Sequence, residues 1–231
     1  MVDYAVIANN VSYRYPDGSL GVENVSLEIK KGEKVAVIGE NGSGKTTLIF
    51  LLSGLLKPSE GEVKILGFTN KQIEEIRKRV GVVFQNPDDF LFNPSVRDEL
   101  LYVPRQLGLS EKEMEEIIRR FSELFGLKDV LEKPPFRLSG GEKKKVAIAS
   151  VLVYTPEIVF LDEPTANVDA KTRKLVGEII TSYNGTVVVA THDLEIAEKC
   201  ERAIVMKKGK VIFDSKFKSI DKRILEIAGV I

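Results

Sequence analysis

The sequence GENGSGKT, residues 39–46, decides the fold of this chain. It matches the pattern G-x-x-x-x-G-K-[ST] at every fixed position. The apolar run KVAVI, residues 34–38, precedes it and predicts a buried strand, and TLIFLLSGLL, residues 47–56, follows it with the apolar spacing of a helix. In this context the pattern predicts a phosphate-binding loop and disfavours a chance glycine turn between a strand and a helix.

Each part of this loop has a chemical reason. Gly39, Gly42 and Gly44 are expected to allow positive φ angles and a close approach of the backbone to a ligand. Successive N–H groups would then face one concavity, and the start of the helix adds the positive end of its dipole. Lys45 would reach the β and γ phosphates, and Thr46 would offer its hydroxyl to Mg²⁺.

Composition places the chain among globular proteins. It has 231 residues, enough for one large domain or two small ones, and 43% of them are hydrophobic. Its 34 basic and 34 acidic residues balance, so no nucleic acid partner is expected. The single cysteine, Cys200, excludes an intrachain disulfide. The opening stretch MVDYAVIANN lacks the features of a signal peptide, and no apolar run is long enough to predict a membrane span.

Residues 3–38 alternate short apolar segments with turns, which predicts a β-rich, antiparallel beginning. Tyr15 lies just before the turn at residues 16–18. Its ring could stack on an adenine base, or it could be an ordinary half-buried strand aromatic. The residues alone leave both interpretations open.

A helical region follows the strand that runs into Gln85. Gln85 is either a ligand-facing amide at the end of that strand or a cap for the next loop. Residues 95–133 have helical spacing and charge, with Ser110 as an N-cap, and Pro104 is expected to kink or end the first helical piece. We interpret this region as a helical subdomain inserted into an α/β core.

A second glycine turn opens the next predicted helix. Ser139, Gly140 and Gly141 precede the apolar run VAIASVLV. A Ser-Gly-Gly turn at a helix start can bind an anion by the same physics as the first loop, although serine and glycine are also common N-caps.

Two later strands end in polar side chains. The stretch EIVFLDEP, residues 157–164, predicts a buried strand ending in Asp162 and Glu163. Asp162 would hold Mg²⁺, and Glu163, on the other side of the strand's pleat, would polarise a water molecule. The strand in residues 186–193 delivers His192, the only histidine, which could bind a γ-phosphate or hold the attacking water. Residues 203–213 predict a hairpin, and a short helix of unassigned function is expected after it.

Taken in order, these motifs resemble the nucleotide-binding subunit of ABC transporters over essentially the whole chain. The matching segments are GENGSGKTT (39–47), FQNP with Gln85, LSGGE (138–142), IVFLDEPT (158–165), ANVD (166–169) and THD around His192. LSGG separates this family from other P-loop proteins. The resemblance implies an α/β fold: a P-loop NTPase (RecA-like) core with an N-terminal antiparallel β subdomain and an inserted α-helical subdomain. It implies one domain over residues 1–231, with the core and β subdomain in 1–85 and 156–231 and the helical subdomain in about 86–155.

The resemblance also assigns the site. The residues implied for ATP are Tyr15, Gly39, Asn41, Gly42, Ser43, Gly44, Lys45, Thr46, Thr47, Ser139, Gly140, Gly141, Glu142 and Asp169. The residues implied for Mg²⁺ are Thr46, Gln85 and Asp162. Glu163 would act as the general base or water-orienting group, assisted by His192 and Gln85.

A finer resemblance concerns the transported substrate. The segments FQNPDDFLF (84–92) and PFRLSGGEKKKVAIA (135–149) are similar to the energy-coupling-factor and cobalt-type ATPases, which usually have Gln where Phe90 and Glu142 stand here. The similarity implies an importer of a vitamin or a transition-metal ion.

The same resemblance implies partners and a location. Two ATPase chains, identical or homologous, would pair head to tail, with residues 39–47 of one facing residues 139–142 of the other. Transmembrane transporter subunits would hold the pair at the cytoplasmic face of the membrane as a peripheral component.

Two other functions share part of this pattern. A soluble ABC ATPase acting on DNA or ribosomes would carry a long coiled-coil insertion or a second cassette, and neither lies in this sequence. A P-loop kinase would lack the LSGG segment. Co-purification with a membrane protein would separate a transporter subunit from a soluble ATPase.

Overall fold

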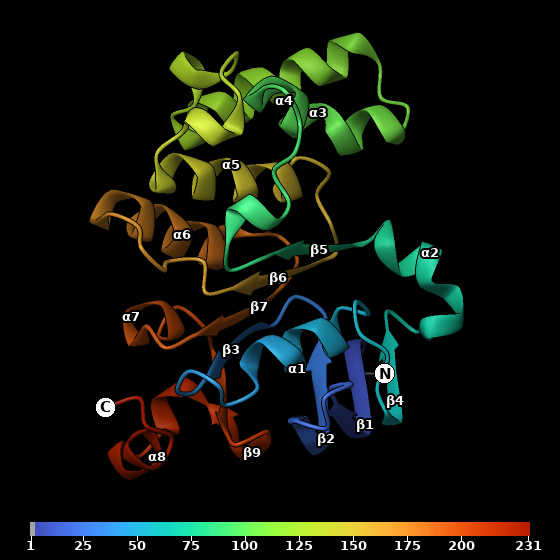
Figure 1. The fold of residues 1–231 in the computed structure, drawn as a ribbon, viewed down its shortest axis with the longest axis vertical. Coiled ribbons are helices and arrows are strands. Elements are labelled where there is room, and N and C mark those ends of the chain that lie inside the picture. Colours follow the sequence, from blue (N-terminus) through green and yellow to red (C-terminus); the bar gives the residue numbers. More distant parts are fainter. Residues whose placement is uncertain (1–2) are drawn as a thin grey trace. The chain divides into compact units, whose positions relative to one another are not determined.

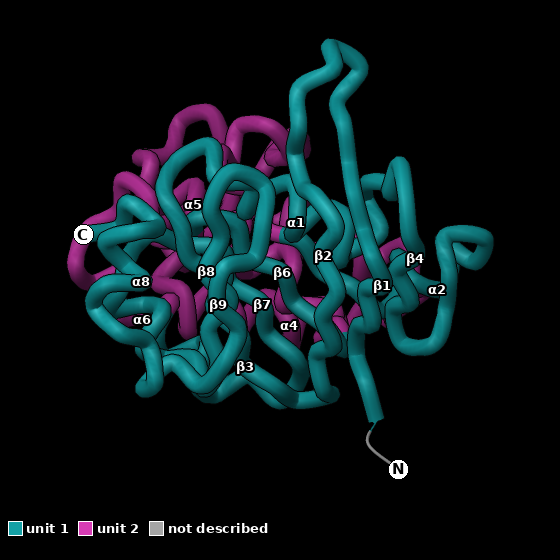
Figure 2. The backbone as a smooth tube through the Cα atoms, turned by 90° about the horizontal axis from the view of Figure 1, so that it is seen from below, with its two compact units in different colours: residues 1–82, 157–163, 177–231 teal, residues 83–156, 164–176 magenta. Residues whose placement is uncertain are grey.

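The computed structural model describes residues 3–231. Residues 1–2, part of the opening stretch in which no signal peptide is expected, lie outside the described residues. Figure 1 shows the fold as a ribbon. The chain forms two compact units, which Figure 2 shows in different colours. Unit 1 comprises residues 1–82, 157–163 and 177–231, and unit 2 comprises residues 83–156 and 164–176.

A mixed sheet of six strands forms the centre of the fold, in the order β5-β6-β7-β3-β8-β9. The strands are β3 (Lys34–Ile38), β5 (Val80–Val83), β6 (Ile158–Asp162), β7 (Thr186–Thr191), β8 (Arg202–Lys207) and β9 (Lys210–Lys216). β3 runs parallel to its neighbours β7 and β8, and β6 runs parallel to β7. The carboxyl ends of β3, β6 and β7 therefore meet at one edge, where α/β proteins bind ligands.

A second sheet of three strands contains β2 (Leu20–Lys30), β1 (Tyr4–Arg14) and β4 (Glu60–Ile65). β1 pairs antiparallel with both neighbours, which confirms the antiparallel beginning. The β8–β9 hairpin is also confirmed, because these strands pair antiparallel around Lys208 and Gly209. Both residues have positive φ angles, 47° and 79°, as a tight hairpin turn requires.

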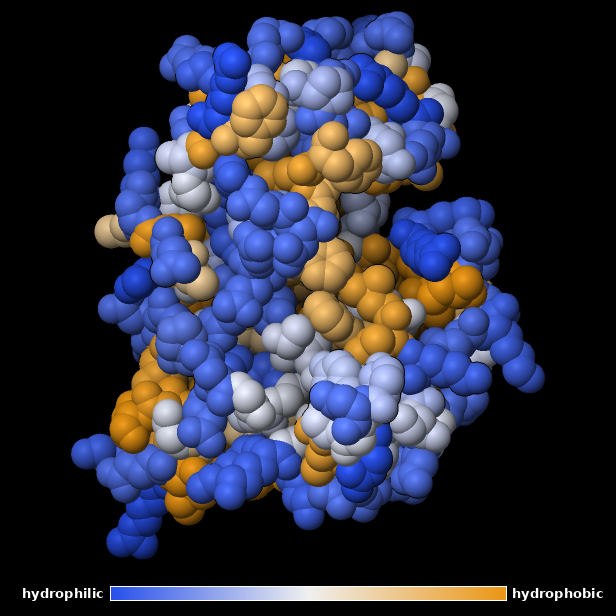
Figure 3. All heavy atoms as spheres, in the orientation of Figure 1, coloured by the Kyte–Doolittle hydropathy of each residue, from blue (hydrophilic) through white to orange (hydrophobic). Residues whose placement is uncertain are grey.

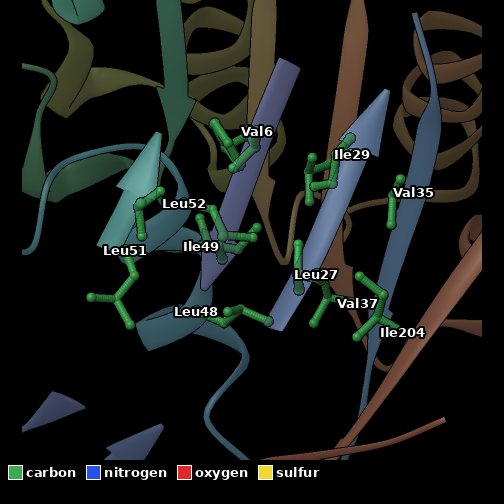
Figure 4. Close-up of a cluster of buried hydrophobic side chains, with 14 of the residues drawn as sticks. Val6, Leu27, Ile29, Val35, Val37, Leu48, Ile49, Leu51, Leu52 and Ile204 are labelled. Carbon is green, nitrogen blue, oxygen red and sulfur yellow. The ribbon is translucent and has the colours of Figure 1, made fainter. Parts of the chain in front are cut away.

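The hydrophobic core of unit 1 lies between these strands and α1 (Lys45–Leu52). Figure 4 shows side chains of β1, β2, β3 and α1 pointing toward one another, among them Val6, Leu27, Val37 and Ile49. Burial of each such side chain contributes about 1.5–3 kcal/mol, so the core holds α1 firmly behind the loop that begins it. α1 ends four residues before the predicted end, since the chain turns at Gly54 with a φ of 80°.

The remaining helices of unit 1 are short. They are α2 (Ile73–Arg77), α7 (Leu194–Ala197) and α8 (Lys222–Ile227), with 3₁₀ turns at Asn70–Gln72 and Phe217–Ser219. α8 confirms the short helix expected after the hairpin. The helix α6 (Ala170–Ser182) contributes residues to both units.

Unit 2 contains α3 (Val96–Gln106), α4 (Glu111–Phe125) and α5 (Gly140–Leu152). Its 3₁₀ turns are Pro87–Asp89, Lys128–Val130 and Pro135–Arg137. Ser110 caps α4 in a capping box with Glu113, as predicted. Pro104 lies inside α3, which continues for two residues and then ends at Gln106. In the described part of the chain, residues 3–231, no helix is long and apolar enough to cross a membrane.

Candidate functional site

Two of the three glycines in the loop between β3 and α1 have the positive φ angles that the sequence predicts. Gly42 and Gly44 have φ angles of 79° and 102°. Gly39 does not have a positive φ, so the prediction for its backbone was wrong. A Cβ atom at Gly39 would lie 2.6 Å from the carbonyl oxygen of Met206 and 2.5 Å from Oγ of Ser43. Gly39 therefore serves close packing rather than a left-handed turn.

Other segments of unit 1 contact this loop. The N–H of Gly209, in the β8–β9 turn, donates to the carbonyl oxygen of Ser43 at 2.9 Å. A Cβ atom at Gly44 would collide with the carbonyl oxygen of Gly21 in β2. The loop thus keeps its shape through contacts with distant parts of the sequence as well as through its own glycines.

Lys45 is buried at the start of α1, with 6% of its side chain exposed. Its Nζ donates to the carbonyl oxygens of Gly39 at 2.8 Å and Glu40 at 3.1 Å. Nζ also lies 3.4 Å from Oε1 of Glu163, whose side chain is 4% exposed. A buried ammonium group needs such acceptors and a countercharge. The predicted phosphate-binding lysine and the predicted general base are therefore in direct contact.

Thr46 and Asp162, the two residues of unit 1 predicted to hold Mg²⁺, contact each other. The Thr46 hydroxyl donates to Oδ2 of Asp162 at 2.8 Å, and Asp162 is the last, buried residue of β6. Hydroxyl and carboxylate oxygens are the hard ligands that Mg²⁺ prefers, so this donor set fits the ion. Among residues 3–231, no group of three or more His, Cys, Asp or Glu side chains could hold a metal alone. The ion would need further oxygens, such as those of phosphates.

Glu163 takes up an unusual backbone conformation directly after β6. Its φ is 43°, a left-handed value that costs a residue other than glycine about 1–3 kcal/mol. Its N–H still donates to the carbonyl oxygen of Ala190 in β7 at 2.9 Å. The prediction placed Glu163 by alternation along the strand, but the strand ends at Asp162. A left-handed turn, rather than the pleat, directs the Glu163 side chain.

His192 follows β7 and completes this cluster. Its Nδ1 lies 2.9 Å from Oε2 of Glu163. The His192 side chain is 58% exposed whereas that of Glu163 is 4% exposed, so the imidazole connects a buried carboxylate with solvent. The contact follows from the strand order, because β6 and β7 are neighbours whose carboxyl ends lie at the same edge.

Tyr15 lies beside the loop, just after β1. Its hydroxyl shares a hydrogen bond of 2.7 Å with the Thr47 hydroxyl. Its ring packs edge to face against Tyr13, with 5.1 Å between the centroids. The Tyr15 residue is 37% exposed, so part of it is open to solvent.

Ser139 opens α5 in unit 2 and is engaged by its own chain. Its hydroxyl and its N–H donate to Oε2 of Glu142 at 2.7 and 2.8 Å, and its Oγ accepts the N–H of Glu142 at 3.3 Å. These bonds to Ser139 lower the pKa of the Glu142 carboxyl below its ordinary value. A Cβ atom at Gly140 would meet nothing within 4 Å, so the surface beside it is open, and Gly141 follows in the first turn.

Gln85 and Asp169 also belong to unit 2. The carbonyl oxygen of Gln85 accepts a 2.5 Å hydrogen bond from Nζ of Lys144, a residue of α5 that is 2% exposed. Asp169 accepts the N–H of Thr172 at 2.7 Å, and this bond lowers the pKa of the Asp169 carboxyl. Gln85 is thus tied to the helix that Ser139 opens.

Two features of these sites were not predicted from the sequence. The Lys45–Glu163 contact joins residues far apart in sequence, and no spacing rule predicts it. Lys144 lies between two other lysines, and no contact was predicted for it. Its one signal was its helical spacing relative to the apolar run that starts at Val146.

Comparison with known proteins shows the family of this chain. A family profile described as ABC transporter matches residues 22–166. Over 229 residues the chain is 57% identical to an ABC transporter ATP-binding protein of Archaeoglobus fulgidus, covering 97% of this chain and 96% of that protein. It is 43% identical over 211 residues to the energy-coupling factor transporter ATP-binding protein EcfA of Methanothermobacter thermautotrophicus, covering 88% of this chain and 68% of that protein.

A solved structure is also similar. The structure of cbiO1 from Clostridium perfringens, described as part of the ABC transporter complex cbiONQ, superimposes with a TM-score of 0.80. The two sequences are 34% identical, and the match covers 97% of this chain and 90% of that one. This match bears out the α/β P-loop fold class, and it bears out the resemblance to cobalt-type ATPases.

Proposed function

The chain belongs to the ABC transporter family as an ATP-binding, ATP-hydrolysing subunit, and we propose that it powers the import of a vitamin or a transition-metal ion. The observation that carries the ATPase part is the cluster in which Glu163 lies between Lys45 and His192, beside the Thr46–Asp162 pair. The likeness to EcfA and to cbiO1 of the cbiONQ complex supports the substrate class.

The phosphates would bind to the loop between β3 and α1. The loop residues and their neighbours proposed for ATP are Tyr15, Gly39, Asn41, Gly42, Ser43, Gly44, Lys45, Thr46 and Thr47. Lys45 would turn from Glu163 and from the loop carbonyls toward the phosphates. The negative phosphates would then take the place of the Glu163 carboxylate as the countercharge of the Lys45 ammonium group. Tyr15, held at the loop by Thr47, would stack on the adenine base.

The release of Lys45 would free Glu163 for catalysis. Its carboxylate would then accept a proton from the attacking water, and the His192 imidazole, 2.9 Å from Oε2, would orient the carboxylate and the water. Thr46 and Asp162 would hold Mg²⁺ with help from Gln85. When bound, the ion would neutralise charge that develops on the phosphate oxygens.

A second ATPase chain, identical or homologous, would supply the other side of the nucleotide through Ser139, Gly140, Gly141 and Glu142. The start of α5 has the N–H groups and the dipole to bind an anion. To do so, Ser139 would have to exchange the Glu142 carboxylate for a phosphate oxygen. Asp169, which caps α6, would lie at the same junction between chains.

Transmembrane subunits would dock on unit 2, and the chain would sit at the cytoplasmic face of the membrane. Figure 3 shows apolar side chains among the polar ones at the surface. In unit 2 Phe92 and Tyr102 are 65% and 40% exposed and pack edge to face at 5.0 Å. Both residues come after Gln85 in the sequence. The carbonyl oxygen of Gln85 accepts a hydrogen bond from Lys144 of α5. This aromatic pair is a suitable docking point for an apolar segment of a membrane partner.

The test is co-purification followed by transport. The tagged chain is expressed in its native organism. Integral membrane proteins that purify with it are identified by mass spectrometry. We expect a multi-span protein that is lost with Phe92→Asp and retained with Leu124→Asp, a matched change at another exposed apolar residue of unit 2. Cells that contain both proteins should accumulate a radiolabelled metal ion or vitamin, and Glu163→Gln should stop this uptake. Absence of any membrane partner would contradict the proposal.

A further inference from the structure

The segment after β9 has no role in the function proposed above. α8 (Lys222–Ile227) begins at Asp221, whose side chain accepts the N–H of Arg223 at 2.9 Å. No residue of α8 is buried. Ala228, the next residue, is 0% exposed. Ala228 is therefore the point at which this segment packs firmly against the rest of unit 1.

Ala228 is packed against the phosphate-binding loop. Its carbonyl oxygen accepts the N–H of Glu40 at 3.3 Å. Gly229, with a φ of 69°, ends the helix, and a Cβ atom there would lie 2.7 Å from Oε2 of Glu40. Backbone and side chain of Glu40 thus both meet this segment.

Glu40 also accepts a hydrogen bond from Lys45. The carbonyl oxygen of Glu40 accepts Nζ of Lys45 at 3.1 Å and the N–H of Ser43 at 3.2 Å. When Lys45 turns to a phosphate, Glu40 loses the first of these bonds. The bond from Glu40 to Ala228 does not depend on Lys45, so it can hold the loop while Lys45 moves.

We propose that Ala228 and Gly229 position the phosphate-binding loop for ATP by holding Glu40. The inference rests on ATP binding by this loop. A loop with glycines at 39, 42 and 44 has many accessible backbone conformations, and only a fraction of them presents its N–H groups together. A contact that raises this fraction strengthens binding by the same factor. These residues act through Glu40 and do not touch the nucleotide.

The test compares two variants that add the same carboxylate at adjacent positions. Ala228→Glu cannot fit at a fully buried position and undocks the segment, whereas Ile227→Glu changes a residue that is 53% exposed. The dissociation constant of a fluorescent ATP analogue is measured with Mg²⁺, together with kcat and the thermal midpoint without nucleotide. We expect Ala228→Glu to weaken binding about threefold to tenfold, the range that one net backbone hydrogen bond supplies. Its kcat at saturating ATP should remain near wild type, and Ile227→Glu should match wild type throughout.

A second variant covers the case in which Ala228→Glu does not fold. Asp221→Ala removes the cap of α8 without adding bulk, and it should weaken binding in the same direction by a smaller factor. Unchanged or tighter binding in a folded variant with a lowered thermal midpoint would mean that the segment only stabilises the fold, which overturns the inference. Failure of the wild-type chain to bind the analogue would instead refute the proposed function.

Discussion

Glu163→Gln is the substitution that the site geometry predicts most sharply. It removes the charge of a buried carboxylate whose two oxygens contact Lys45 and His192 at 3.4 and 2.9 Å. It keeps the shape of the side chain, so the left-handed backbone and its N–H bond to Ala190 need not change. The effect should therefore be chemical rather than structural.

The distances indicate opposite effects on turnover and binding. A general base contributes about 10²–10⁴-fold to rate, so steady-state ATP hydrolysis should fall by about that factor. The attraction between Lys45 and Glu163 at 3.4 Å is about 5 kcal/mol for an effective dielectric constant of about 20, before the cost of burial. Since this attraction competes with the phosphates for Lys45, its loss should leave ATP binding equal or tighter.

Two assays separate these effects. Phosphate release measures turnover, and equilibrium titration with a fluorescent ATP analogue measures binding. Glu198→Gln is the matched control, because Glu198 is an exposed glutamate of unit 1 and should keep wild-type values in both assays. Turnover of Glu163→Gln within about tenfold of wild type would exclude Glu163 as the base. Loss of binding would refute the competition between Glu163 and the phosphates for Lys45.

Further predictions concern unit 2 and the buried thiol. Ser139→Arg should leave binding of one ATP intact and prevent ATP-driven dimerisation, and size-exclusion chromatography that still shows an ATP-dependent dimer would contradict the two-sided site. Because Ser139 lowers the pKa of Glu142 below its ordinary 4.5, the capping box should add stability above about pH 4.5 and lose it as the pH falls through the lowered pKa. Urea unfolding at several pH values should show this loss in wild type and not in Glu142→Gln. Burial raises the pKa of the Cys200 thiol to about 12, so a thiol reagent at pH 8 should label it only after unfolding; rapid labelling of the native chain would be inconsistent with this.

Much of the fold could be predicted because its signals are local. The loop at residues 39–46 with its flanking apolar runs, and the capping box at Ser110, depend on neighbours in sequence, and the structure has them where expected. The predicted end of α1 was wrong by four residues, since the helix ends before a turn at Gly54. Pro104 could stay inside α3 because it lies in its last turn.

The details of the site depend on contacts between distant residues. Gly39 matched the loop pattern, but what it meets is the carbonyl of Met206, which no local rule reveals. The ends of β6 and β7 were predicted as ligand-facing, whereas the contact between Glu163 and His192 required the order of the strands. The Glu40–Ala228 bond joins the loop to a segment with no motif, so only the structure could show it.

Complementation between two inactive variants tests most directly that a second chain completes the site. Lys45→Ala removes the phosphate-binding lysine, and Ser139→Arg blocks the opposite side, so each variant alone should be inactive. If wild-type chain alone hydrolyses ATP, an equal mixture of the two variants should recover activity, because the mixed dimer has one complete site. No recovery from a mixture of folded variants that forms mixed dimers with ATP would contradict a site shared between chains.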